Sequence, residues 1–346
     1  MFIKYFPGVV AFVICLAALP LVSALAHRFH LYDASGPLKI HRGSIPRLGG
    51  IAMFAGFLAG SFIFFLPSWR TSTLPILVFA GVWAVGLLDD LQGLPALFRF
   101  AVQIAAGATA WLAGWRLEWF SSPVLDFAAT CLFVATVVNA MNLLDGMDGL
   151  AAGTGVVVSI GFLLISAVDG SILEVALAAS LLGACAGVLT VNAPPASMFM
   201  GDSGSTLIGI VLAFLSLNWV REQSSARGIL VPLIFLSVPI ADAGLAILRR
   251  VRARQKLFTG DRRHFYDILL HRGWTVDGVL RVSMGVTASL VFVGWLCSRG
   301  IADDRITAIV ILCALAAIAI PLGSLQPDLS SVPANQPETP IGPAIE

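Results

Sequence analysis

Residues 151–191 read AAGTGVVVSIGFLLISAVDGSILEVALAASLLGACAGVLTV, and this stretch decides the class of fold. It contains two apolar segments, 151–168 and 172–191, which are separated only by Asp169-Gly170-Ser171. A helix needs about 20 apolar residues to cross a hydrocarbon core of ~30 Å, and both segments approach that length. Because a backbone in lipid must satisfy its own hydrogen bonds, each segment is predicted to be a transmembrane helix.

The rest of the chain has the same apolar character. Hydrophobic residues make up 58% of the 346 residues and charged residues 12%, whereas an ordinary soluble domain has about 25% charged residues. The net charge of +1 gives no overall attraction to nucleic acid, and no nucleic-acid partner is expected. The five cysteines lie singly in apolar stretches and are interpreted as packing residues. Gly183 and Gly187 form a GxxxG step that predicts close helix packing.

The apolar stretches predict an all-α fold, a polytopic transmembrane helix bundle of about 11 spans. The predicted spans are 8–27, 48–66, 72–88, 98–115, 124–141, 151–168, 172–191, 204–220, 228–248, 281–298 and 305–323. Residues 1–323 therefore form the predicted membrane domain. Residues 324–346 are polar and rich in proline, and they are predicted to be a disordered tail.

The distribution of positive charge predicts how the chain crosses the membrane. Summed over alternate connections, 14 Lys and Arg residues fall on one side and seven on the other. Cytoplasmic connections are enriched in Lys and Arg, so the amino terminus is predicted outside and the carboxyl terminus inside. The first span ends in Ala24-Leu25-Ala26, which imitates a signal-peptidase site, but the positive charges from Arg28 onward favour a retained span.

Two polar motifs lie in the first predicted cytoplasmic connections. Residues 41–50, HRGSIPRLGG, make His41 and Arg47 candidate contacts for phosphate, and the alternative is a topology anchor. Asp89 and Asp90 end the third span, where the helix dipole disfavours anions by ~0.3–1 kcal/mol each. A bound cation would reverse that penalty, and two solvated acids are the alternative.

The most specific string is Asn139-Ala-Met-Asn142-Leu-Leu-Asp145-Gly146-Met-Asp148-Gly149-Leu150. Its amides, carboxylates and glycines supply hydrogen bonds and turns at the end of the fifth span. The string lacks the third-position ligand and the terminal glutamate of a calcium loop. A binding loop is therefore favoured over both a calcium site and a plain polar turn.

A fourth motif, NAPPASMFMGDSGS over residues 192–205, leads into the eighth span. Asp202, Ser203 and Ser205 can cap the new helix. The same helix start also offers free amide groups to a phosphate, with Asp202 placed to bind a metal beside it.

The last connection, roughly 249–281, is strongly basic and contains Arg262 and Arg263, candidate contacts for the substrate phosphates, and His264, a candidate catalytic residue. Part of its charge is expected to attract anionic lipid headgroups. Asp242 lies about two turns before this connection, near the inner end of the ninth span. An ionisable group at that depth is a site candidate, and a pair with a nearby arginine is the alternative.

Taken in order, these motifs resemble the polyprenyl-phosphate N-acetylhexosaminyl-1-phosphate transferase family, also called glycosyltransferase family 4. The resemblance runs from about residue 40 to 275. It implies an enzyme of the bacterial inner membrane with an open cytoplasmic active-site cleft. The implied reaction couples a UDP-linked amino sugar to undecaprenyl phosphate with Mg²⁺, or alternatively Mn²⁺, and releases UMP.

The resemblance also implies roles for single residues. Asp89 and Asp90 match the family's paired acids, with Asp89 the base or phosphate-positioning group and Asp90 also a candidate for the metal. Asp202 matches the metal-ligand aspartate, and Phe199 a residue near the uracil. The nucleotide-binding string is matched by Asn139, Asn142, Asp145 and Asp148. Direct attack and a covalent aspartyl intermediate both remain open.

One departure concerns the donor sugar. Relatives that transfer GlcNAc show His-Ile-His-His where this chain has His264-Phe265-Tyr266-Asp267, so only His264 carries over. This variant resembles a branch that starts O-antigen chains with 6-deoxy amino sugars such as N-acetylfucosamine or N-acetylquinovosamine. The sequence therefore predicts that this segment helps to select the donor.

Two other classes of function are alternatives to a transferase. A secondary transporter would also have many spans, but transporters usually place charged groups near the bilayer midplane. Here the acids cluster at the ends of the predicted helices. A catalytically silent family member is the second alternative, and the complete acidic motifs argue against it. The oligomeric state is not predicted.

Overall fold

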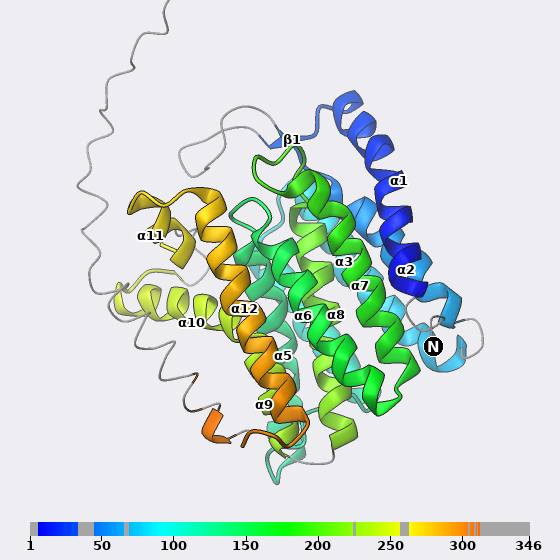
Figure 1. The fold of residues 1–346 in the computed structure, drawn as a ribbon, viewed down its shortest axis with the longest axis vertical. Helices are drawn as coiled ribbons and strands as arrows, with labels where there is room; N and C mark the ends of the chain where they lie inside the picture. The colour runs from blue at the N-terminus through cyan, green and yellow to red at the C-terminus, as the bar shows by residue number, and fades with distance from the viewer. Residues whose placement is uncertain are drawn as a thin grey trace, which may run out of the picture.

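The computed structural model describes residues 6–33, 45–65, 69–223, 226–256, 263–303, 305–307, 309 and 311. These residues form a bundle of helices with one very short sheet (Figure 1). The helices are α1 Phe6–Arg28, α2 Gly49–Phe65, α3 Trp69–Gln92, α4 Ala96–Leu112, α5 Pro123–Leu144, α6 Leu150–Asp169, α7 Ile172–Asn192, α8 Gly201–Gln223, the 3-10 helix η3 Ala226–Ile229, α9 Leu230–Phe235, α10 Ser237–Arg252, α11 Phe265–His271 and α12 Val276–Ser298. The strands are β1 Tyr32–Asp33 and β2 Ile45–Pro46, which pair antiparallel.

Within the described residues, seven helices are long and apolar enough to cross a membrane. They are α1, α3 over Thr73–Gln92, α5, α6, α7, α8 and α12. The apolar parts of α2 and α4 are shorter, with α4 covering 17 residues. The chain is thus a polytopic helical membrane protein, as the sequence predicted. The described residues thus contain seven such helices, fewer than the roughly 11 predicted spans. Most of the last predicted span, 305–323, lies outside the described residues.

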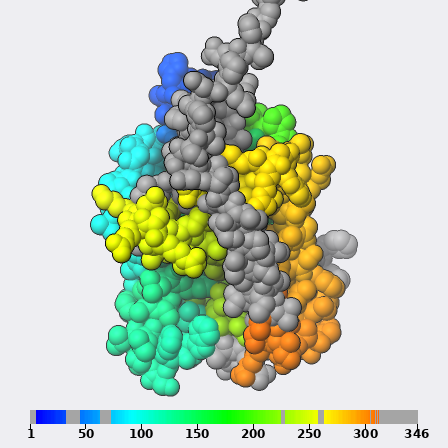
Figure 2. All heavy atoms as spheres, turned by 90° about the vertical axis from the view of Figure 1, so that its left-hand side faces the viewer, coloured from blue at the N-terminus to red at the C-terminus, as the bar shows by residue number. Residues whose placement is uncertain are grey.

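The prediction of one continuous span over 228–248 is wrong. The helix α9 ends at Phe235, and α10 starts at Ser237 after a break at Leu236. Pro239 explains the break, because in a continuous helix its ring would clash with the carbonyl group of Phe235, four residues earlier. In Figure 1 α10 runs across the bundle instead of along it, and Figure 2 shows it in yellow on the face toward the viewer.

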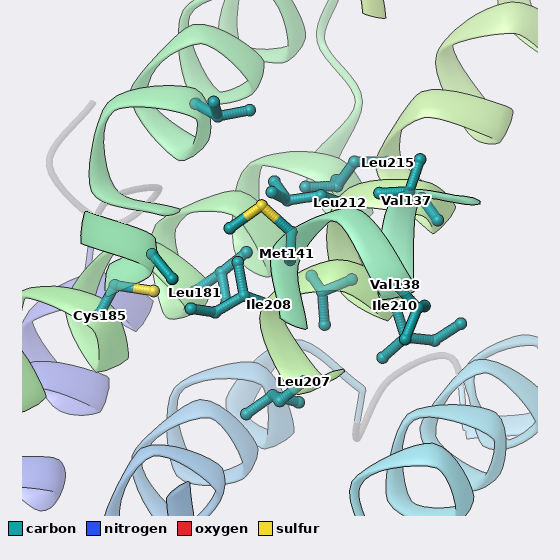
Figure 3. Close-up of a cluster of buried hydrophobic side chains, with 14 of the residues drawn as sticks. Val137, Val138, Met141, Leu181, Cys185, Leu207, Ile208, Ile210, Leu212 and Leu215 are labelled. Carbon is teal, nitrogen blue, oxygen red and sulfur yellow. The ribbon is translucent and has the colours of Figure 1, made fainter. Parts of the chain in front are cut away.

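The helix α8 is the centre of the bundle. All residues from Ser203 to Val220 are buried, and α8 packs against α3 and α5. Figure 3 shows side chains of α8, among them Leu207, Ile208 and Leu212, gathered with Met141 of α5 and Leu181 of α7. Because α8 is packed on all sides, its first turn, which contains Asp202, is held in a fixed position.

Small residues let α1 and α7 approach closely, which confirms the packing predicted from the GxxxG step. A Cβ atom added at Gly187 would lie 2.8 Å from Cβ of Cys15, and one at Gly183 would collide with the backbone of Gly8. The thiol of Cys15 donates to the carbonyl oxygen of Ala184 at 3.5 Å. Four cysteines fall in the described residues, and all four are buried as expected: Cys15, Cys131, Cys185 and Cys297.

Residues 45–50 run beside the loop that precedes α8. The Phe199 amide donates to Pro46 O at 2.8 Å, and the amides of Gly49 and Gly50 donate to Phe199 O at 3.0 Å and Met200 O at 2.8 Å. This pairing and the β1–β2 ribbon are the described exceptions to the predicted all-α fold. Their effect is to bring two motifs that are about 150 residues apart in sequence to one end of the bundle.

Candidate active site

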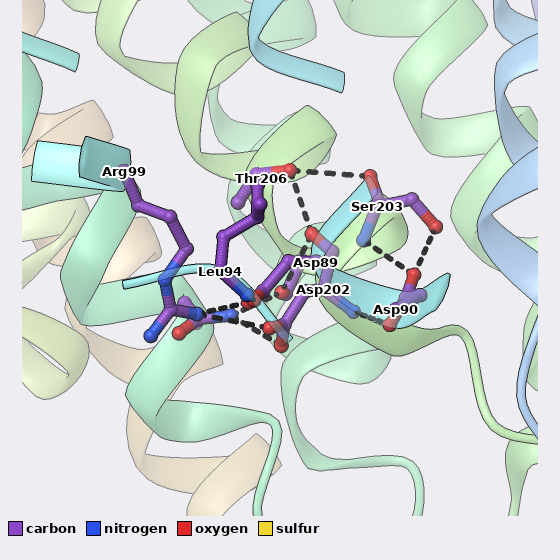
Figure 4. Close-up of polar contacts among 9 residues, drawn as sticks. Asp89, Asp90, Leu94, Arg99, Asp202, Ser203 and Thr206 are labelled. Atoms are coloured by element: carbon purple, nitrogen blue, oxygen red, sulfur yellow. Dashed lines mark hydrogen bonds and ion pairs between the residues drawn. The ribbon is translucent and has the colours of Figure 1, made fainter. Parts of the chain in front are cut away.

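The end of α3 meets the start of α8 through the carboxylate of Asp90. One oxygen accepts the Asp202 amide at 2.8 Å, and the other accepts the Ser203 amide at 3.0 Å and the Ser203 hydroxyl at 2.7 Å (Figure 4). Asp90 is only 4% exposed. A carboxylate at a helix amino terminus is stabilised by that helix's dipole. The start of α8 therefore compensates the unfavourable position of Asp90 at the end of α3.

This contact changes the role predicted for the start of α8. The sequence suggested that its free amides would bind a phosphate, but the amides of Asp202 and Ser203 already bind Asp90. Gly201 makes the contact feasible. Its φ is +73°, and an added Cβ would lie 2.6 Å from both carboxylate oxygens of Asp90.

Arg99, in the first turn of α4, joins two carboxylates of the cluster. Its Nη1 donates to Oδ2 of Asp89 and, at 3.0 Å, to Oδ2 of Asp202 (Figure 4). The other oxygen of Asp89 accepts the Leu94 amide at 2.5 Å. The Asp89 side chain is 7% exposed, whereas that of Asp202 is 34% exposed. Asp202 is thus the more accessible of the two carboxylates.

Arg99 is one of the 14 basic residues on the predicted cytoplasmic side, and its position in a helix carries a further signal. A cation in the first turn of a helix opposes the helix dipole, as Asp89 and Asp90 do at the end of α3. Two such mismatches at neighbouring helix ends indicate an ion pair between them. That reasoning would have found Arg99.

The two asparagines of the predicted nucleotide-binding string have different surroundings. Asn142 Nδ2 donates to Oδ1 of Asp202 at 2.8 Å and to the Ser205 hydroxyl at 3.0 Å, so it belongs to the carboxylate cluster. Asn139 donates instead to Gln103 Oε1 on α4 and to Ala135 O at 2.8 Å. The hydrogen bonds of Asn139 therefore tie α5 to α4.

The carboxylates that follow α5 continue the site. Asp148 Oδ2 accepts the Ala196 amide at 2.9 Å, which fixes the loop before α8.

The pKa of Asp145 is raised well above its usual range. The largest cause is the loss of water around the Asp145 carboxyl group, followed by the negative charges of Asp202, Asp90 and Asp148. Asp145 is therefore an acid that keeps its proton more readily than an exposed aspartate does.

This raised pKa predicts the pH dependence of stability. Above the ordinary pKa of an aspartate, the unfolded chain releases a proton that folded Asp145 retains, so stability falls as the pH rises towards the folded-state pKa. Asn cannot titrate. We expect the ligand-free Asp145→Asn protein to lose less thermal stability than wild type between pH 5 and pH 8, measured as Tm in detergent. Asp277→Asn, at an exposed position on α12, is the control that should keep the wild-type slope. Equal slopes for wild type and Asp145→Asn would contradict this assignment.

The basic residues predicted to bind phosphate are only partly placed. His41 and Arg262 lie outside the described residues. Arg47 is half-buried, pairs through its backbone with Phe199, and interacts electrostatically with the carboxylate of Asp90. Arg263 is half-buried, two residues before the start of α11. Phe199 is half-buried beside Arg47, so the structure brings these two predicted residues together at the edge of the carboxylate cluster.

His264 lies at the start of α11, and its partner is Asp242. Its Nδ1 is 2.6 Å from Asp242 Oδ2, so the arginine partner considered for Asp242 gives way to a histidine. Tyr266 donates its hydroxyl to Leu143 O at 3.2 Å and lies against Gly146. The short helix α11 is thereby docked on the end of α5 and the turn that follows it.

Asp89 and Asp202 are the two carboxylates of this cluster that could hold a metal ion. Among the described residues, no group of three or more His, Cys, Asp or Glu side chains is arranged to hold a metal alone. Mg²⁺, however, typically takes one or two carboxylates and completes its shell with water and substrate phosphate. The Arg99 guanidinium bridges Asp89 and Asp202, so these two carboxylates already share one cationic group. The oxygens of Asp90 instead accept hydrogen bonds from the start of α8.

The fold and the site define an integral membrane protein with a cluster of carboxylates, an arginine and an amide at one end of its bundle. The profile of glycosyl transferase family 4 matches residues 72–220. A probable undecaprenyl-phosphate N-acetylglucosaminyl 1-phosphate transferase of Bacillus subtilis is 31% identical over 281 residues, which cover 77% of this chain and 78% of the relative. This chain belongs to glycosyl transferase family 4.

Two further relatives have related names. A decaprenyl-phosphate N-acetylglucosaminephosphotransferase of Mycobacterium leprae is 34% identical over 304 residues, covering 77% of this chain and 76% of the relative. An undecaprenyl-phosphate alpha-N-acetylglucosaminyl 1-phosphate transferase of Escherichia coli is 28% identical over 272 residues, covering 72% of each. The family resemblance inferred from the motifs is thus confirmed.

Proposed function

We propose that this protein transfers an N-acetylhexosamine 1-phosphate from a UDP-sugar to undecaprenyl phosphate. An oxygen of the lipid phosphate attacks the β-phosphorus of the UDP-sugar, and the bond from that phosphorus to the bridging oxygen breaks. The products are a polyprenyl-diphosphate-sugar and UMP. The relatives' names support the acceptor and the transferred group, and the product would start a cell-envelope polysaccharide.

The observation that carries this proposal is the meeting of Asp89, Arg99 and Asp202 beside the Asn142 to Asp148 loop. A diphosphate and a phosphate monoester repel each other, so a site for both needs cationic groups and positioned donors. Arg99 supplies a cation. Asp89, largely buried and held by the Leu94 amide, is suited to position the attacking phosphate or to accept its proton.

We place a Mg²⁺ ion with Asp202, which is accessible, and with Asp89 as its second carboxylate. When bound, the ion would neutralise charge that develops on the diphosphate. Asp90 then acts through α8, because its carboxylate holds the backbone that carries Asp202. Asn142 orients Asp202 from the other side. The nucleotide would lie against the loop formed by Asn142, Asp145 and Asp148, with Phe199 near the base.

The location follows from the same reasoning. We assign the protein to a bacterial inner membrane, with the site end of the bundle facing the cytoplasm, where UDP-sugars are made. The excess of Lys and Arg in the connections at that end supports this orientation. A transporter is disfavoured by the placement of the described carboxylate cluster at helix ends.

Two donors have specific support. The relatives' names favour UDP-GlcNAc, whereas Tyr266 and Asp267, which replace histidines of the GlcNAc pattern, favour a 6-deoxy amino sugar. Tyr266 lies against Gly146 in the predicted donor loop, and this contact supports a role in donor selection.

The test is an assay of the purified protein with undecaprenyl phosphate and a panel of UDP-sugars, with UMP and the lipid product measured by mass spectrometry. We expect transfer from at least one UDP-N-acetylhexosamine, and loss of transfer when divalent ions are chelated. No transfer from any donor would contradict the proposed function. A tenfold or greater preference in kcat/KM for UDP-GlcNAc over the 6-deoxy sugars would contradict donor selection by residues 264–267.

A further inference from the structure

Asp242 and His264 form a buried pair that the proposed chemistry has not used. The Asp242 side chain is 3% exposed and the His264 side chain 5%, and Oδ2 lies 2.6 Å from Nδ1. The two residues come from different parts of the chain, because Asp242 lies on the buried face of α10 and His264 directly precedes α11. The pair therefore joins the two elements on either side of the basic connection.

Asp242 holds more than the ring of His264. Its second oxygen, Oδ1, accepts the Phe265 amide at 3.1 Å. The carboxylate thus fixes both the backbone at the start of α11 and the orientation of the imidazole. The side chain of Asp267 accepts the His264 amide at 3.3 Å, so the backbone is held from a second direction.

One face of the imidazole ring is held by an aromatic contact. The ring of His264 stacks on that of Tyr266, with centroids 5.4 Å apart and planes 7° from parallel. Tyr266 in turn donates to Leu143 O at 3.2 Å, in the last turn of α5. A short series of contacts, Asp242 to His264 to Tyr266 to Leu143, therefore places the imidazole relative to the loop that follows α5.

A buried pair of this kind is not explained by stability. Replacing a buried ion pair with apolar residues of similar volume is often neutral or stabilising. An acceptor behind one ring nitrogen of a histidine, by contrast, fixes which nitrogen carries the proton. An ionised carboxylate can only accept, so this contact requires a hydrogen on Nδ1 and leaves Nε2 on the side of the ring away from Asp242.

We propose that Asp242 is a positioning residue for His264, which contacts the diphosphate of the donor in the reaction proposed above. Asp242 accepts the Nδ1 hydrogen and keeps the ring in one orientation, so that Nε2 has a fixed direction away from Asp242. The inference rests on the proposed function for its effect on turnover. The orientation of the ring is a separate matter that can be measured without substrate.

The first experiment measures that orientation in the wild-type protein. Histidine labelled with ¹⁵N gives distinct NMR shifts for the two tautomers, and His264→Gln identifies the signal of His264 among the five histidines. We expect the Nδ1 nitrogen of His264 to carry the hydrogen. A His264 signal with the hydrogen on Nε2 alone would overturn the proposal whether or not the variants fold and whether or not the protein transfers sugar phosphate.

The second experiment measures kinetics of Asp242→Asn, His264→Ala and the double variant in detergent. We expect Asp242→Asn to lower kcat about 10- to 100-fold, as for loss of a group that orients a reacting one, with KM for the UDP-sugar within threefold of wild type. Added to His264→Ala, Asp242→Asn should change kcat less than twofold. Asp242→Glu, which keeps the carboxylate, should recover part of the lost turnover.

Asp126→Asn is the matched control. Asp126 is also buried, and its carboxylate accepts the amides of Trp119 and Phe120 at 2.8 and 2.7 Å, at the start of α5. It should lower Tm and leave kcat within threefold. A full effect of Asp242→Asn in the His264→Ala background, or a kcat within threefold of wild type, would overturn the proposal. An inactive wild-type protein with the expected NMR tautomer would instead contradict the proposed function alone.

Discussion

Asp202→Asn should lower kcat by about 10²-fold or more, the range typical of positioned acid–base and charge-stabilising groups, and it should weaken the dependence on Mg²⁺. Asn keeps the size of the side chain but removes the charge. Arg99 and Asn142 each donate to one oxygen of Asp202, so the NH₂ group of an asparagine would face a donor instead of an acceptor. Asp89→Asn should lose turnover to a similar extent while UDP-sugar binding is largely retained.

The double variant makes this prediction specific. Because Arg99 joins Asp89 and Asp202 into one unit, the double variant should be scarcely worse than the worse single variant. Asp169→Asn is a suitable control, since Asp169 also pairs with an arginine, Arg299, at 3.1 Å but lies at the far end of α6. Folded Asp89→Asn and Asp202→Asn proteins that both keep kcat within threefold of wild type would remove these residues from the mechanism.

Gly201→Ala is expected to have the second largest effect. The backbone at this position is left-handed, with φ of +73°, and alanine would have to adopt it. The added Cβ would also lie 2.6 Å from both oxygens of Asp90. The backbone conformation costs about 1–2 kcal/mol. Displacing a buried carboxylate from its donors costs about 1–3 kcal/mol more. Because Asp202 is the next residue, turnover should fall together with stability.

Gly93→Ala separates the two causes. Gly93 has nearly the same backbone angle, φ +69°, but an added Cβ there meets nothing within 4 Å. Unfolding in detergent should show a clearly larger loss of stability for Gly201→Ala than for Gly93→Ala, and only Gly201→Ala should lose most of its activity. Equal losses in the two variants would mean that the contact with Asp90 contributes nothing measurable.

Much of the fold could be predicted because hydrocarbon imposes simple rules on length and composition. The long helices α5, α6, α7 and α8 closely follow the predicted apolar stretches. The ninth predicted span shows the limit of that reasoning. Its hydropathy was sufficient for a span, but Pro239 divides the segment, and the polar face of α10 with Asp242 and Arg250 packs against the bundle.

The site could be predicted as a set of residues but not as a set of contacts. The motifs indicated that Asp89, Asp90 and Asp202 would meet, and their hydrogen bonds show that they do. They did not indicate that Asp90 would bind the first amides of α8, because a helix cap supplied by another helix leaves no local pattern. The partners of Arg99 are 10 and 103 residues away in sequence, so the unfavourable position of its charge at a helix start is the sequence signal for this ion pair.

The most direct test of the account follows the β-phosphate of the donor. The purified protein would be given undecaprenyl phosphate and a UDP-N-acetylhexosamine with ³²P in the β-phosphate, and the label would be measured in the lipid and nucleotide fractions. Transfer of sugar 1-phosphate predicts that the label enters the lipid and that the released UMP is unlabelled, with little transfer by Asp202→Asn. Labelled UDP, with an unlabelled sugar on the lipid, would contradict the account.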